Sequence, residues 1–110
     1  MLSAMLFLFQ TAQATSVGSS QVVEQVQEMR GVWVTRWTWD SEADIRRMMA
    51  EIDAAGLNAV FFQVRGEFDA YYPSEIEPWA IRLTGQLGPD PGWDPLAVAV
   101  DAAHAHGVQL

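Results

Sequence analysis

Residues 58–64 read NAVFFQV, a nearly unbroken apolar run. Such a run is typical of a parallel strand that is buried on both faces. Upstream of it, residues 31–37 (GVWVTRW) are β-branched and aromatic and predict another strand. Residues 108–110 (VQL) have the composition of the start of a third. Helical patterns fill both intervals, so the expected order is strand, helix, strand, helix, strand.

Both expected helices carry their own start and stop signals. Ser41 is a natural N-cap, and Asp44 three residues later has the spacing of a capping box. Gly56 supplies the left-handed residue that ends this helix. The second helix starts at Asp94, with a proline at its first position, and ends before Gly107. The expected buried stripes are Ile45, Met48, Met49, Ile52 and Ala55 in the first helix, and Leu96, Ala99, Val100 and Ala103 in the second.

This alternation predicts a parallel α/β fold with right-handed crossovers. Two architectures use it, the (β/α)8 barrel and the open doubly wound sheet. A dinucleotide-binding sheet needs a glycine-rich turn after its first strand, but residues 36–40 (RWTWD) contain no glycine. Arg36 and Trp37 at a strand end suit the mouth of a barrel instead. We therefore expect the N-terminal β-α-β-α-β portion of a (β/α)8 TIM barrel.

The length of 110 residues limits this expectation, because a whole barrel takes about 250 residues. Two βα units and the start of a third strand would leave open sheet edges and half-covered faces. The sequence therefore predicts a truncated barrel, the N-terminal piece of a longer protein. Residues 29–110 are the expected barrel fragment.

The first 14 residues have the pattern of a signal peptide. Residues 2–9 (LSAMLFLF) form an apolar run, and residues 12–14 (AQA) offer a small-x-small cleavage site. The stretch has no Lys or Arg before its apolar run, so a buried N-terminal helix is the alternative. We expect export to the periplasm or the extracellular space, with cleavage after Ala14. Residues 15–28 (TSVGSSQVVEQVQE) predict a linker.

The composition excludes several classes of function. Six Arg and no Lys stand against 14 Asp plus Glu, for a net charge of -8, so we expect no nucleic-acid partner. The lack of cysteine excludes disulfides, thiolate metal sites, cysteine nucleophiles and lipid-anchored cysteine. No apolar run approaches the ~18–20 residues of a membrane span. His104 and His106 fall on different helix faces, and we expect neither a metal nor a cofactor.

The chemistry visible in the sequence lies in the connection between Arg65 and Asp94, residues 66–93 (GEFDAYYPSEIEPWAIRLTGQLGPDPGW). Ordinary βα loops have about 2–6 residues, and long ones that are not disordered are usually functional. In a barrel, this connection would lie on the face where active sites form. Aromatic rings beside carboxylates and an Arg suit a neutral polyhydroxylated ligand.

Each polar or aromatic candidate also has a structural alternative. Gln63 lines the barrel mouth or satisfies a buried backbone group. Arg65 binds a ligand or pairs with Glu67 or Asp69 to pin the connection. The aromatic rings Tyr71, Tyr72, Trp79 and Trp93 stack on a ligand or anchor the loop.

Four carboxylates of the connection are candidate acids by residue type alone: Glu67, Asp69, Glu75 and Glu77. Glycoside hydrolysis uses two carboxyl groups about 5–5.5 Å apart for retention or ~6.5–9.5 Å apart for inversion. Spacing along a loop fixes no such distance, so a solvated acidic loop is the alternative.

Several segments together resemble the glycosyl hydrolase-like 10 family. They are residues 29–35 (MRGVWVT), 56–65 (GLNAVFFQVR), 69–74 (DAYYPS), 77–79 (EPW), 83–85 (LTG), 90–96 (DPGWDPL) and 103–107 (AHAHG). The resemblance implies an eight-fold barrel, an exported or envelope location, and a glycoside hydrolase acting on a bacterial polysaccharide such as the amino-sugar glycan of peptidoglycan.

The resemblance places the catalytic acids on the fourth and later strands, beyond Leu110, and carries over no catalytic residue. It leaves five positions as substrate-binding or loop-ordering residues: Gln63, Arg65, Asp69, Tyr71 and Trp79. Two alternatives stay open, a non-catalytic carbohydrate-binding barrel and an inactive truncated fragment.

Overall fold

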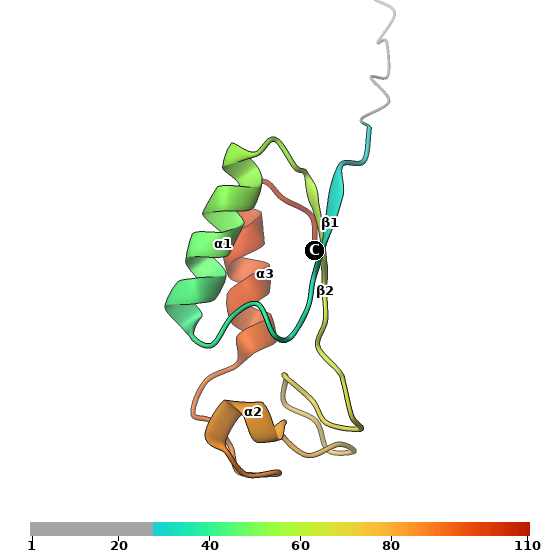
Figure 1. Cartoon of the computed structure of the whole chain (residues 1–110), viewed down its shortest axis with the longest axis vertical. Coiled ribbons are helices and arrows are strands. Elements are labelled where there is room, and N and C mark those ends of the chain that lie inside the picture. Colours follow the sequence, from blue (N-terminus) through green and yellow to red (C-terminus); the bar gives the residue numbers. More distant parts are fainter. Residues whose placement is uncertain (1–27) are drawn as a thin grey trace, which may run out of the picture.

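The computed structural model describes residues 28–110, so the expected signal peptide (1–14) and nearly all of the expected linker (15–28) lie outside the described residues. Two parallel strands and two longer helices form an α/β unit (Figure 1). The strands are β1 (Gly31–Val34) and β2 (Ala59–Phe62), and the helices are α1 (Glu42–Ala54), α2 (Ile81–Thr84) and α3 (Pro95–Ala105). Both α1 and α3 lie on one side of the strand pair.

The strands follow chain order in the sheet. β1 and β2 are parallel, with Gly31 opposite Ala59 and Val34 opposite Phe62. On the other side of β2, Gln109 forms a parallel bridge to Ala59, so the expected third strand begins there. The parallel α/β arrangement predicted from the sequence is confirmed for this unit.

Both strands are shorter than the sequence predicts. After Val34 the carbonyl of Thr35 accepts hydrogen bonds from the Thr38 N–H at 3.2 Å and the Thr38 hydroxyl at 2.8 Å, which turns the chain out of the sheet. The Gln63 N–H still donates to the Val34 carbonyl at 2.9 Å, but β2 ends at Phe62. The aromatic residues in the segment 36–39 therefore lie in a turn and not in a strand.

The helix ends follow the sequence signals. The Ser41 hydroxyl accepts a hydrogen bond from the Asp44 N–H at 3.2 Å, and the Asp44 carboxylate accepts one from the Ser41 N–H at 3.1 Å, which completes the capping box. Gly56 follows α1 with a φ of 77°. Asp94 caps α3, since its side chain accepts from the Ala97 N–H at 3.0 Å. No helix within residues 28–110 is long and apolar enough to cross a membrane.

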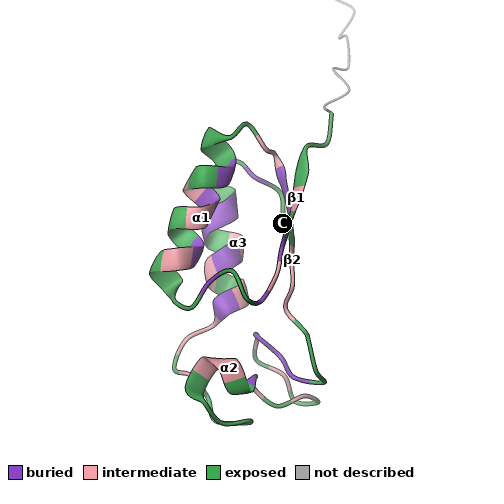
Figure 2. Cartoon of the chain, viewed as in Figure 1, coloured by how far each residue is buried: buried purple, intermediate pink, exposed green. Residues whose placement is uncertain are grey.

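The core lies between the helices and the strand pair, where Figure 2 shows the buried segments facing one another. Val34 and Val60 from the strands pack with Ile45 and Met49 of α1. Burying a side chain of this size contributes roughly 1.5–3 kcal/mol. The buried residues of α3 are Pro95, Ala99, Ala102 and Ala103.

The predicted buried stripe of α3 was wrong at two positions. Leu96 and Val100 are half-buried, while Ala102 is buried. The buried residues recur at i, i+4, i+7 and i+8, so they form one stripe, rotated from the predicted one toward small residues, on a helix that packs against α1. Alanines at this contact allow the two helices to approach closely.

No residue in the described range covers the opposite face of the strand pair. Trp33 and Phe61 are exposed there and stack on each other, with ring centroids 6.2 Å apart. Their neighbours Val32, Val34, Val60 and Phe62 pack against the helices, as alternation along a strand requires. The strand pair thus has one covered and one aromatic, exposed face.

Replacing Ser41 tests the capping box. Ser41→Ala removes the acceptor for the Asp44 N–H, so we expect the free energy of unfolding to fall by about 1 kcal/mol. Ser41→Thr retains the hydroxyl and is the matched control, with little change expected. Urea denaturation of the three proteins measures the effect, and an unchanged Ser41→Ala midpoint would contradict the assigned cap.

Candidate functional site

The carboxyl ends of β1 and β2 point to the same end of the molecule, where the long connection and α2 gather (Figure 1). Residues 35–40 follow β1, and residues 63–79 follow β2. Ligands of parallel α/β folds bind at this end of the strands. The polar side chains collected here are therefore the candidate site.

Gln63 joins the ends of the two strands. Its Oε1 accepts a hydrogen bond from the backbone N–H of Arg36 at 3.1 Å, and its Nε2 donates to the Arg65 carbonyl at 3.4 Å. The side-chain amide thus satisfies backbone groups, which is the structural alternative that the sequence allowed. Substrate contact by Gln63 stays a prediction.

Arg65 and Glu77 form a multiple ion pair across the start of the connection. The Arg65 Nε donates to both carboxylate oxygens of Glu77, at 2.6 and 2.7 Å, and the Arg65 Nη2 also contacts Oε1. These bonds hold the pKa of Glu77 below its usual value, and the carboxylate raises the pKa of Arg65. The pair joins the two ends of the segment 65–77 and so holds this part of the connection as a closed loop.

The sequence predicted a different partner for Arg65, either Glu67 or Asp69, and this was wrong. The Asp69 carboxylate accepts a hydrogen bond from the Glu67 N–H at 3.0 Å, within its own turn. The Glu67 carboxylate lies 3.4 Å from the Arg36 guanidinium. Both expected partners are therefore engaged elsewhere, and Glu77 takes their place.

Asp69 and Tyr71 are buried beneath the surface of the site. Asp69 is 4% exposed and Tyr71 is 1% exposed. The Tyr71 ring packs edge-on against Trp39, with centroids 5.5 Å apart, and burial raises the pKa of its hydroxyl. The ring is thus packed inside the connection, and substrate contact by Tyr71 stays a prediction.

Trp79 is half-buried and belongs to the internal framework of the connection. Its backbone forms a parallel bridge to Ala70 and an antiparallel bridge to Gly88. Trp93 packs edge-on against Trp39, with centroids 6.1 Å apart. Both tryptophans anchor the connection, and ligand contact by Trp79 stays a prediction.

Arg36, which the sequence placed at a strand end suited to a barrel mouth but not among the five candidate binding residues, is central to the site. It is largely buried, with its guanidinium 4.6 Å from the ring centroid of Trp37 and against Gly66. A Cβ atom at residue 66 would lie 1.3 Å from Arg36 Nη1, so the guanidinium would have to move to admit one. The glycine directly after Arg65 was the one sequence signal for this close contact.

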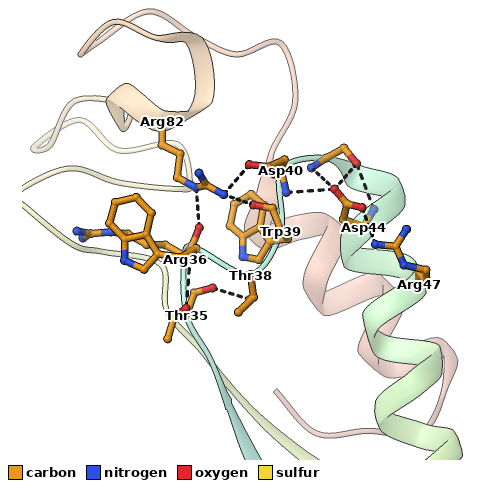
Figure 3. A network of polar contacts seen from close by, with 10 residues as sticks. Thr35, Arg36, Thr38, Trp39, Asp40, Asp44, Arg47 and Arg82 are labelled. Carbon is orange, nitrogen blue, oxygen red and sulfur yellow. Dashed lines mark hydrogen bonds and ion pairs between the residues drawn. The ribbon is translucent and has the colours of Figure 1, made fainter.

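Arg82 of α2 completes the site, as Figure 3 shows. Its Nε donates to the Arg36 carbonyl at 2.8 Å. Its Nη2 donates to the Trp39 carbonyl at 2.8 Å and to the Asp40 carboxylate at 2.5 Å. The guanidinium also lies 5.3 Å from the ring centroid of Trp37, which is 63% exposed. No local pattern predicted these contacts, because they join positions more than 40 residues apart in the chain.

Three of the four candidate acids of the connection have structural partners, and the fourth, Glu75, is exposed. Glu67 pairs with Arg36, and Asp69 binds a backbone N–H. The pKa of Glu77 is lowered, whereas the general acid of a glycosidase needs a raised one. Within residues 28–110, no three His, Asp or Glu side chains are grouped to hold a metal ion. The described residues therefore form a polar and aromatic surface to which we assign no catalytic acid.

A double-mutant cycle tests the contact between Gly66 and Arg36. Gly66→Ala places a Cβ where the guanidinium lies, so we expect a loss of about 1–3 kcal/mol in the free energy of unfolding. In an Arg36→Ala background the same change should cost little, because the guanidinium is gone. Chemical denaturation of all four proteins gives the coupling. Equal costs in both backgrounds would show that the two residues do not touch.

The Arg65–Glu77 pair predicts an acid-sensitive connection. The pKa of Glu77 is lowered in the folded state, so its stabilising effect is present above the unfolded-state pKa and is lost as pH falls through the folded-state value. We expect the protection factors of the amides in residues 66–79, which correct for the slower intrinsic exchange in acid, to fall below about pH 4, the usual range of a glutamate. Glu77→Gln should show fast exchange already at neutral pH. The control Glu75→Gln alters an exposed neighbour, and identical behaviour of the two variants would refute the role of the pair.

Comparison with known proteins connects this site to a family. The sequence profile of the glycosyl hydrolase-like 10 family matches residues 28–110. Glycosyl hydrolase DigH of Escherichia coli K12 is 33% identical over 119 aligned residues, which cover 91% of this chain and 27% of DigH. Glycosyl hydrolase YngK of Bacillus subtilis 168 is 32% identical over 96 residues, 76% of this chain and 19% of YngK. The chain thus spans only about a fifth to a quarter of the length of these curated relatives. It belongs to the glycosyl hydrolase-like 10 family.

Proposed function

We propose that this chain is the N-terminal part of an exported glycoside hydrolase that acts on a bacterial polysaccharide, with the glycan strands of peptidoglycan as the first substrate to test. Its catalytic carboxylates lie beyond Leu110. The observation that carries this proposal is a folded polar and aromatic connection at the carboxyl ends of two parallel strands in a member of a glycosyl hydrolase-like family.

The same unit is, in this proposal, the beginning of a TIM barrel. In such a barrel the helices lie outside, and alternate strand side chains face the interior. The stacked pair Trp33 and Phe61 is exposed on the face opposite α1 and α3, where interior side chains of a barrel belong. Gln109 already bridges to β2 as the next strand would. Further strands would cover the aromatic face and close both edges of the sheet.

The site supports a sugar ligand by its chemistry. Exposed aromatic surface packs against the C–H faces of a sugar ring, while guanidinium, amide and carboxylate groups bind hydroxyls. The acids of the described connection hold loops in place, so the reacting carboxylates come from other strands. A non-catalytic carbohydrate-binding barrel is the second candidate, since the described part of the site is equally suited to binding alone.

The decisive experiment identifies the natural protein and assays it. An antibody against residues 60–95 should detect, in the periplasm or the medium, a species several times heavier than 12.2 kDa. The purified species should release reducing ends from peptidoglycan glycan strands, whereas the isolated 110-residue chain should release none.

The alternative results are distinct. A species near the mass expected after cleavage at Ala14 would overturn the proposal that a longer hydrolase contains this chain. A heavy species that binds the glycan without cleaving it would replace the hydrolase with the non-catalytic barrel. Cleavage by the isolated 110-residue chain would contradict the placement of the acids beyond Leu110.

A further inference from the structure

We infer that the exposed indole of Trp37 is a stacking platform for a neutral sugar ring, at the carboxyl end of β1. This inference rests on the proposed function and adds a binding residue to its site. The sequence placed Trp37 at a strand end suited to the mouth of a barrel, but not among the five candidate positions. The structure places it on a turn, with 63% of its surface exposed.

The backbone around the indole is fixed by its own turn. The Trp37 N–H donates to the Thr35 hydroxyl at 3.4 Å, and Thr38 binds the Thr35 carbonyl through both its N–H and its hydroxyl. Figure 3 shows the bond that the Thr38 hydroxyl makes to Thr35. These contacts hold the tryptophan in one backbone conformation directly after the strand.

Two guanidinium groups support the ring itself. The Cζ of Arg36 lies 4.6 Å from the ring centroid, and the Cζ of Arg82 lies 5.3 Å from it. Arg82 also binds the Arg36 and Trp39 carbonyls, which flank Trp37 in the chain. One side chain from α2 therefore fixes the backbone on both sides of the indole and contacts the ring. A platform ordered in advance loses little entropy when a ligand stacks on it.

The charges around the platform indicate a neutral ligand. Glu67 lies 3.4 Å from the Arg36 guanidinium, and Asp40 accepts from Arg82 at 2.5 Å. Each cation beside the ring is thus already balanced by a carboxylate. No unpaired cation is therefore left beside the ring to attract an anionic sugar. The C–H face of a neutral sugar can pack on the indole without such a charge.

A second exposed ring nearby provides a matched control. Phe68 is 78% exposed, and the Arg65 Cζ lies 5.3 Å from its ring centroid. Its backbone has a φ of 58°, in the left-handed region, and no guanidinium binds the carbonyls on both sides of it. Phe68 therefore resembles Trp37 in exposure and in having a cationic neighbour, but only one guanidinium contacts its ring in the described part of the chain.

The test measures binding of the tetrasaccharide of N-acetylglucosamine to the intact natural protein by isothermal titration calorimetry. We expect Trp37→Ala to weaken binding by about tenfold, the loss of one aromatic stacking contact. Trp37→Phe should recover most of the affinity, and Phe68→Ala should bind as the unaltered protein does. A galacturonic acid tetrasaccharide, an anionic probe, should bind more weakly than the neutral one to the unaltered protein.

Each contrary result would overturn a particular part of the inference. Unchanged affinity in Trp37→Ala, or an equal loss in Phe68→Ala, would overturn the platform and leave the proposed function standing. Thermal denaturation checks the fold: a large fall in Tm for Trp37→Ala with unchanged affinity would show that other parts of the protein cover the ring. Stronger binding of the anionic probe would overturn the neutral class. No binding of either saccharide by the unaltered protein would overturn the proposed function and the platform together.

Discussion

The guanidinium of Arg82 is the contact on which the architecture of the site depends. It joins α2 to the turn after β1 through the carbonyls of Arg36 and Trp39 and the carboxylate of Asp40. A helix of four residues, such as α2, has no stability of its own, because helix nucleation is unfavourable at that length. Its position, and with it the path of the connection, is set by tertiary contacts: those of Arg82, the packing of Leu83 on the core, and the buried Ala80 before it.

The geometry of these contacts explains why arginine, and not lysine, stands at positions 65 and 82. Arg82 serves three acceptors and Arg65 binds both oxygens of one carboxylate, which a planar group with five N–H donors can do. A lysine ammonium carries its three donors on a single nitrogen, so it lacks the spread, planar donors that these acceptors use. The chain has a net charge of -8, and several of its acids lie at the carboxyl ends of the strands. There, Arg65 and Arg82 each neutralise one carboxylate, that of Glu77 and that of Asp40.

The features predicted correctly from the sequence are those that a pattern in the chain specifies. The capping box at Ser41 and the left-handed Gly56 depend on residues close in the chain. The parallel pairing of β1 and β2 follows from two apolar runs with a helix between them. The ends of the strands and the partner of Arg65 depended on contacts that loop spacing does not determine. Tyr71 could not be distinguished from an exposed ring, because its burial depends on Trp39, which follows the other strand.

The protonation state that a general acid needs explains why we assign no catalytic acid to the described site. A general acid must keep its proton at the working pH, which requires burial in apolar surroundings or a neighbouring negative charge. Glu77 has the reverse environment, because the Arg65 guanidinium favours its ionised form. A carboxylate that orders a loop in this way would lose that function if its pKa rose enough for it to donate protons. Ordering the connection and transferring a proton are thus separate tasks for separate residues, and the proposed acids beyond Leu110 leave Glu77 free to remain ionised.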